Sequence, residues 1–234
     1  MAATAPTRRS GTKEEQVADF LREGIISGRY PRGAKLKQQE IADLLKTSIT
    51  PVREALKLLA AEGYVSNDSF RGSVVAPFDL EASTETLDLR IMLETRLVRG
   101  AIERATSADI EELRHLASRF AHAYDKGDSE AARAANYRFH HRMFEIAQMP
   151  QALSFVQILW ARYPFDLIAG IEGRVSRATD EHEDMLEAFI AGDTAAAMLA
   201  TRRHVESGWQ ELRDALLAAQ QGHETAVPGK DSAK

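Results

Sequence analysis

The sequence of 234 residues contains no cysteine and no run of 18 apolar residues. Without cysteine the chain can form neither a disulfide bond nor a thiolate metal site, and it is compatible with a reducing cytoplasm. The arginines at the N-terminus, Arg8 and Arg9, are not followed by an apolar stretch. The sequence therefore predicts neither a signal peptide nor a membrane span, and we expect a cytoplasmic protein.

An excess of positive charge is also missing, since the net charge is −5 at pH 7. The charge is unevenly distributed, however. Residues 1–77 contain 12 Lys and Arg against 9 Asp and Glu, whereas residues 78–234 contain 18 against 26. A mildly basic N-terminal part on an acidic body is typical of a protein that contacts DNA through one end only.

Residues 41–72 predict two short helices followed by a β-hairpin. Apolar positions recur at helical spacing in two stretches, which are separated by Thr47-Ser48. Ser48 is a natural N-cap for the second helix, and Pro51 is tolerated in its first turn. Residues 67–69 (Asn-Asp-Ser) have turn chemistry between two short apolar runs. This order predicts a winged helix-turn-helix, whose second helix is built to lie in the DNA major groove.

The outward face of the second helix presents short hydrogen-bonding or cationic side chains, from Ser48, Thr50, Arg53 and Lys57. Such side chains contact phosphates and base edges. At the expected hairpin tip, Arg71 and Gly72 predict a wing contact with DNA, because glycine permits a close backbone approach. The alternative interpretation is a generic pair of amphipathic helices with a hairpin.

The segment TPVREALKLLAAEGYV (50–65), preceded by GRYPRGAKL (28–36), resembles the DNA-binding domain of the GntR-type bacterial transcription regulators. The C-terminal two-thirds resembles the all-helical ligand-binding (FCD) domain of the FadR-like branch of that family. The resemblance covers roughly residues 12–217. It implies a ligand-responsive transcription factor that binds double-stranded operator DNA, and we expect a homodimer because one helix-turn-helix contacts only one half-site.

The expected fold is mainly α, with the winged helix-turn-helix in front of an antiparallel bundle of six or seven helices. We expect four segments: a disordered N-terminal arm (1–11), a DNA-binding domain (12–77), an all-helical effector-binding and dimerisation domain (78–220) and a disordered tail (221–234). Helical periodicity, with glycine or proline at most ends, predicts bundle helices at 80–105, 108–126, 128–148, 151–169, 174–191 and 193–219.

Several helix ends have recognisable sequence signals. Thr12 begins a capping box for a first helix that reaches Ser27. In the bundle, three residues are expected as N-caps: Ser107, Asp128 and Asp193. Pro164 should kink or split the fourth bundle helix, and Ala76-Pro77 should form a short hinge between the two domains.

Three histidines and an asparagine predict a possible metal site inside the bundle. Asn136 and His140 are four residues apart and therefore project from one helical face. His182 and His204 lie on two consecutive expected helices, on either side of the turn that joins them. At the helical rise per residue, they are roughly 14 and 17 Å from that turn. They can therefore face the bundle centre at nearly equal height. The alternative is that each histidine is satisfied by an ordinary backbone or carboxylate partner.

The family resemblance implies that these residues are metal ligands. The FadR-like ligand domains contain an aspartate or asparagine four before a histidine, matching Asn136 and His140, and further histidines that match His182 and His204. The implied cofactor is a divalent transition metal, zinc or nickel, with open positions for a carboxylate. Aspartate is the commonest first ligand, and Asn136 contributes no charge. We therefore expect weaker metal binding, and the neutral amide allows a different metal to be preferred.

Arg90 is the candidate effector-binding residue, since it lies among apolar residues on the first bundle helix. Its place resembles that of the family arginine that faces the pocket and forks onto an effector carboxylate. The alternative is a surface arginine paired with Glu94 one turn later.

We interpret the chain as a repressor modulated by a small carboxylate, with an activator as an alternative that the sequence does not separate. A metal sensor, in which the ion itself is the effector, is a second alternative. A metal-dependent enzyme is a third, since three histidines with open coordination also describe a catalytic site. Glu181 and Glu183 flank His182 but are expected to point to other faces, which leaves this enzyme without a clear general base.

The DNA-reading residues depart from the family pattern at two positions. Where relatives often have an arginine after the N-cap residue, this chain has Ile49, and Gln39 replaces an arginine of the preceding helix. Loss of one bidentate arginine–guanine contact removes about 1–3 kcal/mol of discrimination at that base. We therefore expect an operator that differs from the family's common core.

We predict that Ile49→Arg changes the preferred half-site, because it restores a guanidinium that can bind guanine O6 and N7. The measurement is selection of bound duplexes from a random pool with the wild-type and variant proteins. Identical selected half-sites would show that Ile49 does not lie on the contact face.

Overall fold

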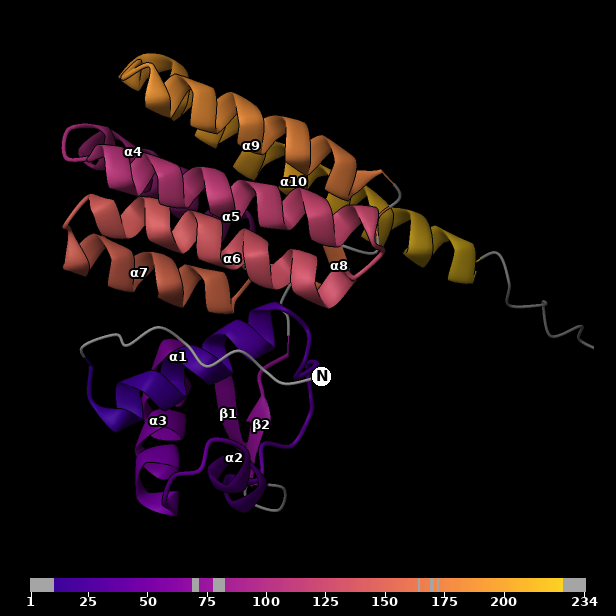
Figure 1. The fold of residues 1–234 in the computed structure, drawn as a ribbon. Coiled ribbons are helices and arrows are strands. Elements are labelled where there is room, and N and C mark those ends of the chain that lie inside the picture. The colour runs from indigo at the N-terminus through magenta and orange to yellow at the C-terminus, as the bar shows by residue number, and fades with distance from the viewer. Residues whose placement is uncertain are drawn as a thin grey trace, which may run out of the picture.

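The computed structural model describes residues 11–68, 72–77, 83–163, 165–168, 171 and 173–224. The N-terminal part consists of α1 (Lys13–Ile26), α2 (Gln38–Leu44), α3 (Ile49–Glu62), β1 (Val65–Asp68) and β2 (Gly72–Val75). The C-terminal part consists of α4 (Ser83–Ile102), α5 (Ser107–Asp125), α6 (Ser129–Ile146), α7 (Pro150–Ala161), α8 (Phe165–Ile168), α9 (Arg174–Ile190) and α10 (Thr194–Glu224). The expected mainly α fold with a hairpin wing is confirmed (Figure 1).

Local signals position the three N-terminal helices. The predicted capping box of α1 is present, since Thr12 and Glu15 exchange both side-chain-to-backbone hydrogen bonds. The buried guanidinium of Arg22 on α1 binds both carboxylate oxygens of Glu62 at the end of α3, at 2.8 and 2.9 Å. Gly63 then ends α3 with a φ of +89°, a backbone conformation that glycine adopts without strain.

The wing is a two-stranded antiparallel sheet. Its register runs from the pair Val65–Val75 to the pair Asp68–Gly72, and Gly72 has a φ of +77°. Arg71, the other residue expected to form the wing contact, lies outside the described residues. The structure therefore defines the stem of the wing.

Ser48 occupies the N-cap position of α3, as expected, but its side chain accepts no cap hydrogen bond. One of its two usual backbone donors is missing. An N-cap side chain bonds the backbone N–H of the second or third helical residue, and the third residue here is Pro51, which has no N–H. The exposed Ser48 hydroxyl is therefore not used for capping.

Two of the three expected bundle caps are confirmed. The carboxylates of Asp128 and Asp193 accept hydrogen bonds from backbone N–H groups at the start of α6 and α10. The expectation for α5 is wrong by one residue. Thr106, not Ser107, caps this helix, because Thr106 forms a reciprocal capping box with Asp109, which an N-cap at the next position could not make.

Two helix ends in the bundle differ from the expected bounds or lie next to residues that are not described. The fourth expected bundle helix is divided into α7, which ends at Ala161, and α8, which begins at Phe165. Pro164, the expected cause of the division, itself lies outside the described residues. Helix α10 continues to Glu224, beyond the expected end at 219; Gln220, Gln221 and Glu224 are good helix formers, and Gly222 is tolerated within the last turns. Residues 225–234 are not described.

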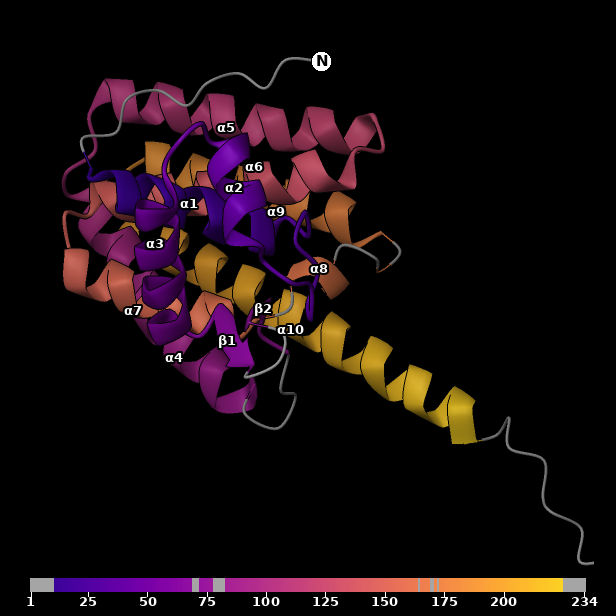
Figure 2. The ribbon, with the colours of Figure 1, turned by 90° about the horizontal axis from the view of Figure 1, so that it is seen from below.

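The two parts of the chain are joined by contacts of α1 with α6 and of α3 with α7. One hydrophobic cluster includes buried side chains from both parts. The Tyr64 hydroxyl donates to the carbonyl of Gln157 at 2.7 Å, and Arg32 donates to the carbonyls of Ala76 and Tyr163 at 3.0 Å each. Figure 2 shows the N-terminal helices lying across the bundle, and the end of α10 projecting beyond it.

Among the described residues, no helix combines the length and the apolar character needed to cross a lipid bilayer.

Candidate functional site

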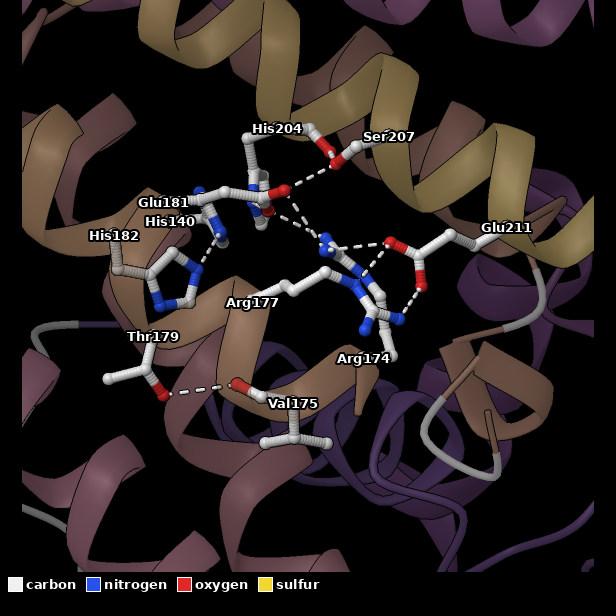
Figure 3. Close-up of polar contacts among 10 residues, drawn as sticks. All are labelled: His140, Arg174, Val175, Arg177, Thr179, Glu181, His182, His204, Ser207 and Glu211. Atoms are coloured by element: carbon white, nitrogen blue, oxygen red, sulfur yellow. Dashed lines mark hydrogen bonds and ion pairs between the residues drawn. The ribbon is translucent and has the colours of Figure 1, made fainter. Parts of the chain in front are cut away.

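The bundle brings three histidines from three helices into direct contact. His140 lies on α6, His182 on α9 and His204 on α10, and their candidate ligand nitrogens all lie within 4.8 Å of one another. The Nε2 atoms of His140 and His182 are 3.1 Å apart, and the His140 and His204 rings are stacked with centroids 4.8 Å apart. The three imidazoles project toward a common point (Figure 3).

Burial keeps these histidines neutral. It lowers the pKa of His140 and of His182 well below the usual value, and neighbouring positive charge lowers both further. Burial also lowers the pKa of His204, although the adjacent Glu181 opposes this shift. A neutral imidazole is the form that binds a transition metal, so the cluster has ligands in the correct protonation state at neutral pH.

Glu181 points to a different helical face from His182, as expected, but it nevertheless lies beside the cluster, against His204. One of its carboxylate oxygens accepts from His204 Nδ1 at 2.7 Å and from Arg174 at 2.8 Å, and the other accepts from the Ser207 hydroxyl at 2.5 Å. Because neighbouring positions on a helix differ by about 100°, Glu181 faces α10 while His182 faces α6. Glu183 is exposed, as expected.

The carboxylate of Glu181 fixes the orientation of His204. Burial alone would raise its pKa, but hydrogen bonds from His204 and Arg174 lower the pKa of Glu181 to about 2. An ionised carboxylate only accepts, so His204 Nδ1 must be the donor and Nε2 has the free lone pair. A carboxylate on the outer nitrogen of a histidine is the usual support for a metal ligand.

The donor set fits a divalent metal. Two nitrogen ligands about 2.1 Å from a tetrahedral or octahedral ion are about 3.0–3.4 Å apart, close to the separation of 3.1 Å between His140 and His182 Nε2. Only one hydrogen bond is possible between these two nitrogens, and the buried Nδ1 atoms of both rings have no partner among the described residues. A cation bound by both Nε2 lone pairs would replace this single hydrogen bond.

Next to the histidines lies a cavity of about 210 Å³. Its wall includes three of the residues singled out from the sequence, Arg90, Asn136 and His204. Most of the remaining wall is apolar or aromatic and includes Phe120, Phe165, Ile168, Ile171, Val175 and Val205. The structure thus places two of the four candidate metal ligands, Asn136 and His204, and the candidate effector-binding arginine around one cavity.

Arg90 is buried, with 4% of its surface exposed, so it is not the surface arginine of the alternative interpretation. Its pairing with Glu94 is nevertheless present, at 2.8 Å, and Glu94 also accepts from Trp160 Nε1 at 2.9 Å. The guanidinium carbon lies 4.2 Å from the centre of the Tyr163 ring. Arg90 Nη1 is buried without a hydrogen-bond partner among the described residues, so its two N–H groups remain for a ligand.

Arg174 is a cavity residue that the sequence analysis missed. It is 4% exposed, lies at the start of α9 and binds Glu181 at 2.8 and 3.1 Å, and its guanidinium is 3.6 Å from Glu211. Its spacing of seven residues from Glu181 places both on one helical face. That spacing was the available signal, but it does not reveal which face is buried.

The residues expected to read DNA are all exposed where they are described, at Gln39, Ser48, Ile49, Thr50, Arg53 and Lys57. Two of them make local bonds, since Gln39 donates to Asp43 at 2.8 Å and Lys57 donates to Glu54 at 2.9 Å. Both bonds are solvent-exposed and can be exchanged for DNA contacts at small cost.

Comparison with known proteins places these features in a family. Residues 13–75 match the gntR family of bacterial regulatory proteins, and residues 85–207 match the FCD domain. The chain belongs to the GntR family. It is therefore a DNA-binding transcription regulator with a ligand-responsive FCD domain, and its family is one of regulators, not of enzymes.

Two curated relatives of this GntR-family regulator are repressors by name. The chain is 30% identical over 206 residues to a probable D-xylose utilization operon transcriptional repressor from Paenarthrobacter nicotinovorans, covering 88% of this chain and 91% of the relative. It is 24% identical over 225 residues to the galactonate operon transcriptional repressor of Escherichia coli, covering 86% and 97%. The solved structure of E. coli McbR/YncC has a TM-score of 0.75 and 25% identity, covering 88% of this chain and 99% of that chain.

Proposed function

We propose that this GntR-family regulator is a repressor whose operator affinity is changed by a small carboxylate. The carboxylate binds in the cavity between a divalent metal, zinc or nickel, and Arg90. The observation that supports this most directly is the position of Arg90, which is buried on the cavity wall with Nη1 unpartnered. A guanidinium donor of this kind is suited to a carboxylate oxygen.

The proposed metal ligands favour an anionic effector. His140, His182 and His204 are neutral, and Asn136 would add a neutral amide oxygen from the preceding turn of α6. None of the four provides negative charge to a divalent ion. A carboxylate in an open coordination position would supply this negative charge. One relative in the family is the repressor of an operon named after galactonate, which is a carboxylate.

The DNA-binding part supports action on a two-fold symmetric operator. The exposed side chains of Ser48, Thr50 and Arg53 lie on the first turns of α3, the helix expected to enter the major groove. One such helix contacts one half-site, so we propose a homodimer in which residues 78–220 provide the dimer contact. Effector binding would shift the population between two bundle arrangements and change the spacing of the two α3 helices through the chain near Pro77.

A metal sensor is the second candidate function, and the histidine cluster favours it because the cluster is complete without any organic ligand. The two functions differ in what changes operator affinity. Metal alone does so in a sensor, whereas a carboxylate is required as well in the function proposed here.

We predict that His182→Ala abolishes the effect of a carboxylate on operator binding but changes operator affinity in its absence by less than about threefold, because the site is remote from α3. Fluorescence anisotropy of labelled operator duplex measures both quantities. His122→Ala is the matched control, since His122 is exposed on the neighbouring helix α5. Equal loss of both quantities would mean that the histidine is structural.

We also predict that Glu181→Gln weakens zinc binding about 10–100-fold, since an amide no longer fixes the His204 ring as an ionised carboxylate does. Competition with a fluorescent zinc chelator gives the affinity. Glu183→Gln, on the exposed side of His182, is the control and should leave zinc affinity unchanged. Equal affinities for both variants would contradict the role of Glu181.

A further inference from the structure

Arg133 belongs both to the effector cavity and to the contact with the DNA-binding part. It lies on α6, between the helix start and Asn136, and forms part of the cavity wall. Its Nε donates to the carbonyl of Ser27 at 2.5 Å, and Ser27 is the fully buried residue that ends α1. One guanidinium therefore connects the cavity directly to the first helix of the winged helix-turn-helix.

Three arginines lie on the cavity wall, and among the described residues Arg133 is the one that has no carboxylate partner. Arg90 is paired with Glu94, and Arg174 is paired with Glu181 and approaches Glu211. Among the described residues, no carboxylate pairs with Arg133, which instead donates to the neutral carbonyl of Ser27. A second anionic group on a ligand would find its strongest available partner at this guanidinium.

Other bonds between α6 and α1 do not reach the cavity. Arg138 binds Glu23 at 2.5 and 2.9 Å, and Glu130 binds Arg29 at 2.8 Å. Neither Arg138 nor Glu130 lies on the cavity wall. These bonds hold together the two parts of the chain, whose arrangement Figure 1 shows, but they cannot contact a ligand in the cavity. Arg133 contacts both the cavity and the end of α1.

We infer that the effector has two anionic groups, of which one binds at Arg90 and the metal and the other binds Arg133. This inference rests on the proposed function and deepens it. A carboxylate is a stronger acceptor for a guanidinium than a backbone carbonyl. Binding of the second group therefore draws Arg133 toward the cavity and weakens its bond to Ser27.

Loss of the hydrogen bond between Arg133 and Ser27 would affect α3, the helix expected to enter the major groove. Helix α1 is fixed to α3 by the buried Arg22–Glu62 ion pair, so the two helices move together. Weakening the tie between Arg133 and Ser27 changes how this pair of helices is held against α6. The effector thereby favours a bundle arrangement in which the operator is bound less tightly.

The test compares linear diacids of three to six carbons with monoacids of the same lengths, by isothermal titration calorimetry on the zinc-loaded full chain. We expect the best diacid to bind the wild type about tenfold or more tighter than its matched monoacid. Arg133→Met should reduce this ratio to about twofold or less while monoacid affinity stays unchanged. Arg138→Met is the matched control, because it breaks a bond between the same helices and should keep the wild-type ratio.

Operator anisotropy with the same diacid completes the test. The diacid should lower operator affinity in the wild type and in Arg138→Met, but not in Arg133→Met. Arg133→Lys, which keeps the charge without the fork, should recover part of the diacid preference, and thermal melting verifies that each variant is folded.

The outcomes separate this inference from the proposed function. An Arg133→Met protein that keeps both the diacid preference and the operator response would overturn the inference alone. A wild type that binds monoacids as tightly as diacids would do the same. A wild type that binds no carboxylate at all would overturn the proposed function and the inference with it.

Discussion

The mutual burial of three neutral imidazoles is the constraint on which the bundle's arrangement depends. His140, His182 and His204 come from three different helices and face one another instead of water. A buried polar group without a partner costs about 1–3 kcal/mol, and the Nδ1 atoms of His140 and His182 have none among the described residues. A metal ion bound by the inner nitrogens would leave these Nδ1 atoms unpaired, but its binding free energy would offset their cost and fix α6, α9 and α10 relative to one another.

Buried charges are organised around this cluster in pairs that also connect helices. Glu181 joins α9 to α10 through His204 and Ser207, and Glu94 joins α4 to α7 through Trp160. Helix α6 provides His140 to the cluster, while Arg133 on the same helix bonds the end of α1. Helix α6 therefore links the site to the DNA-binding part, and a ligand in the cavity would contact this helix directly.

The fold and part of the site could be predicted from the sequence, because both depend on spacing along one helix. Asn136 and His140 share a face by periodicity alone, and the helix-turn-helix follows from caps and apolar positions. The positions of Glu181, Arg174 and Arg133 depend on how neighbouring helices are rotated and packed, which no single-helix pattern contains. The weak cap at Ser48 was predictable in principle, since Pro51 removes one of the two N–H groups that it could bond.

The most direct measurement is thermal unfolding of the zinc-loaded protein with small carboxylic acids, with and without a chelator. A metal-anchored pocket predicts that an acid at about 100 times its dissociation constant raises the Tm by about 5–10 °C, and that chelator abolishes this rise. A stabilising acid whose effect is indifferent to chelator would contradict a metal-anchored site. It would place the anchor at Arg90 and leave the three histidines as packed core residues.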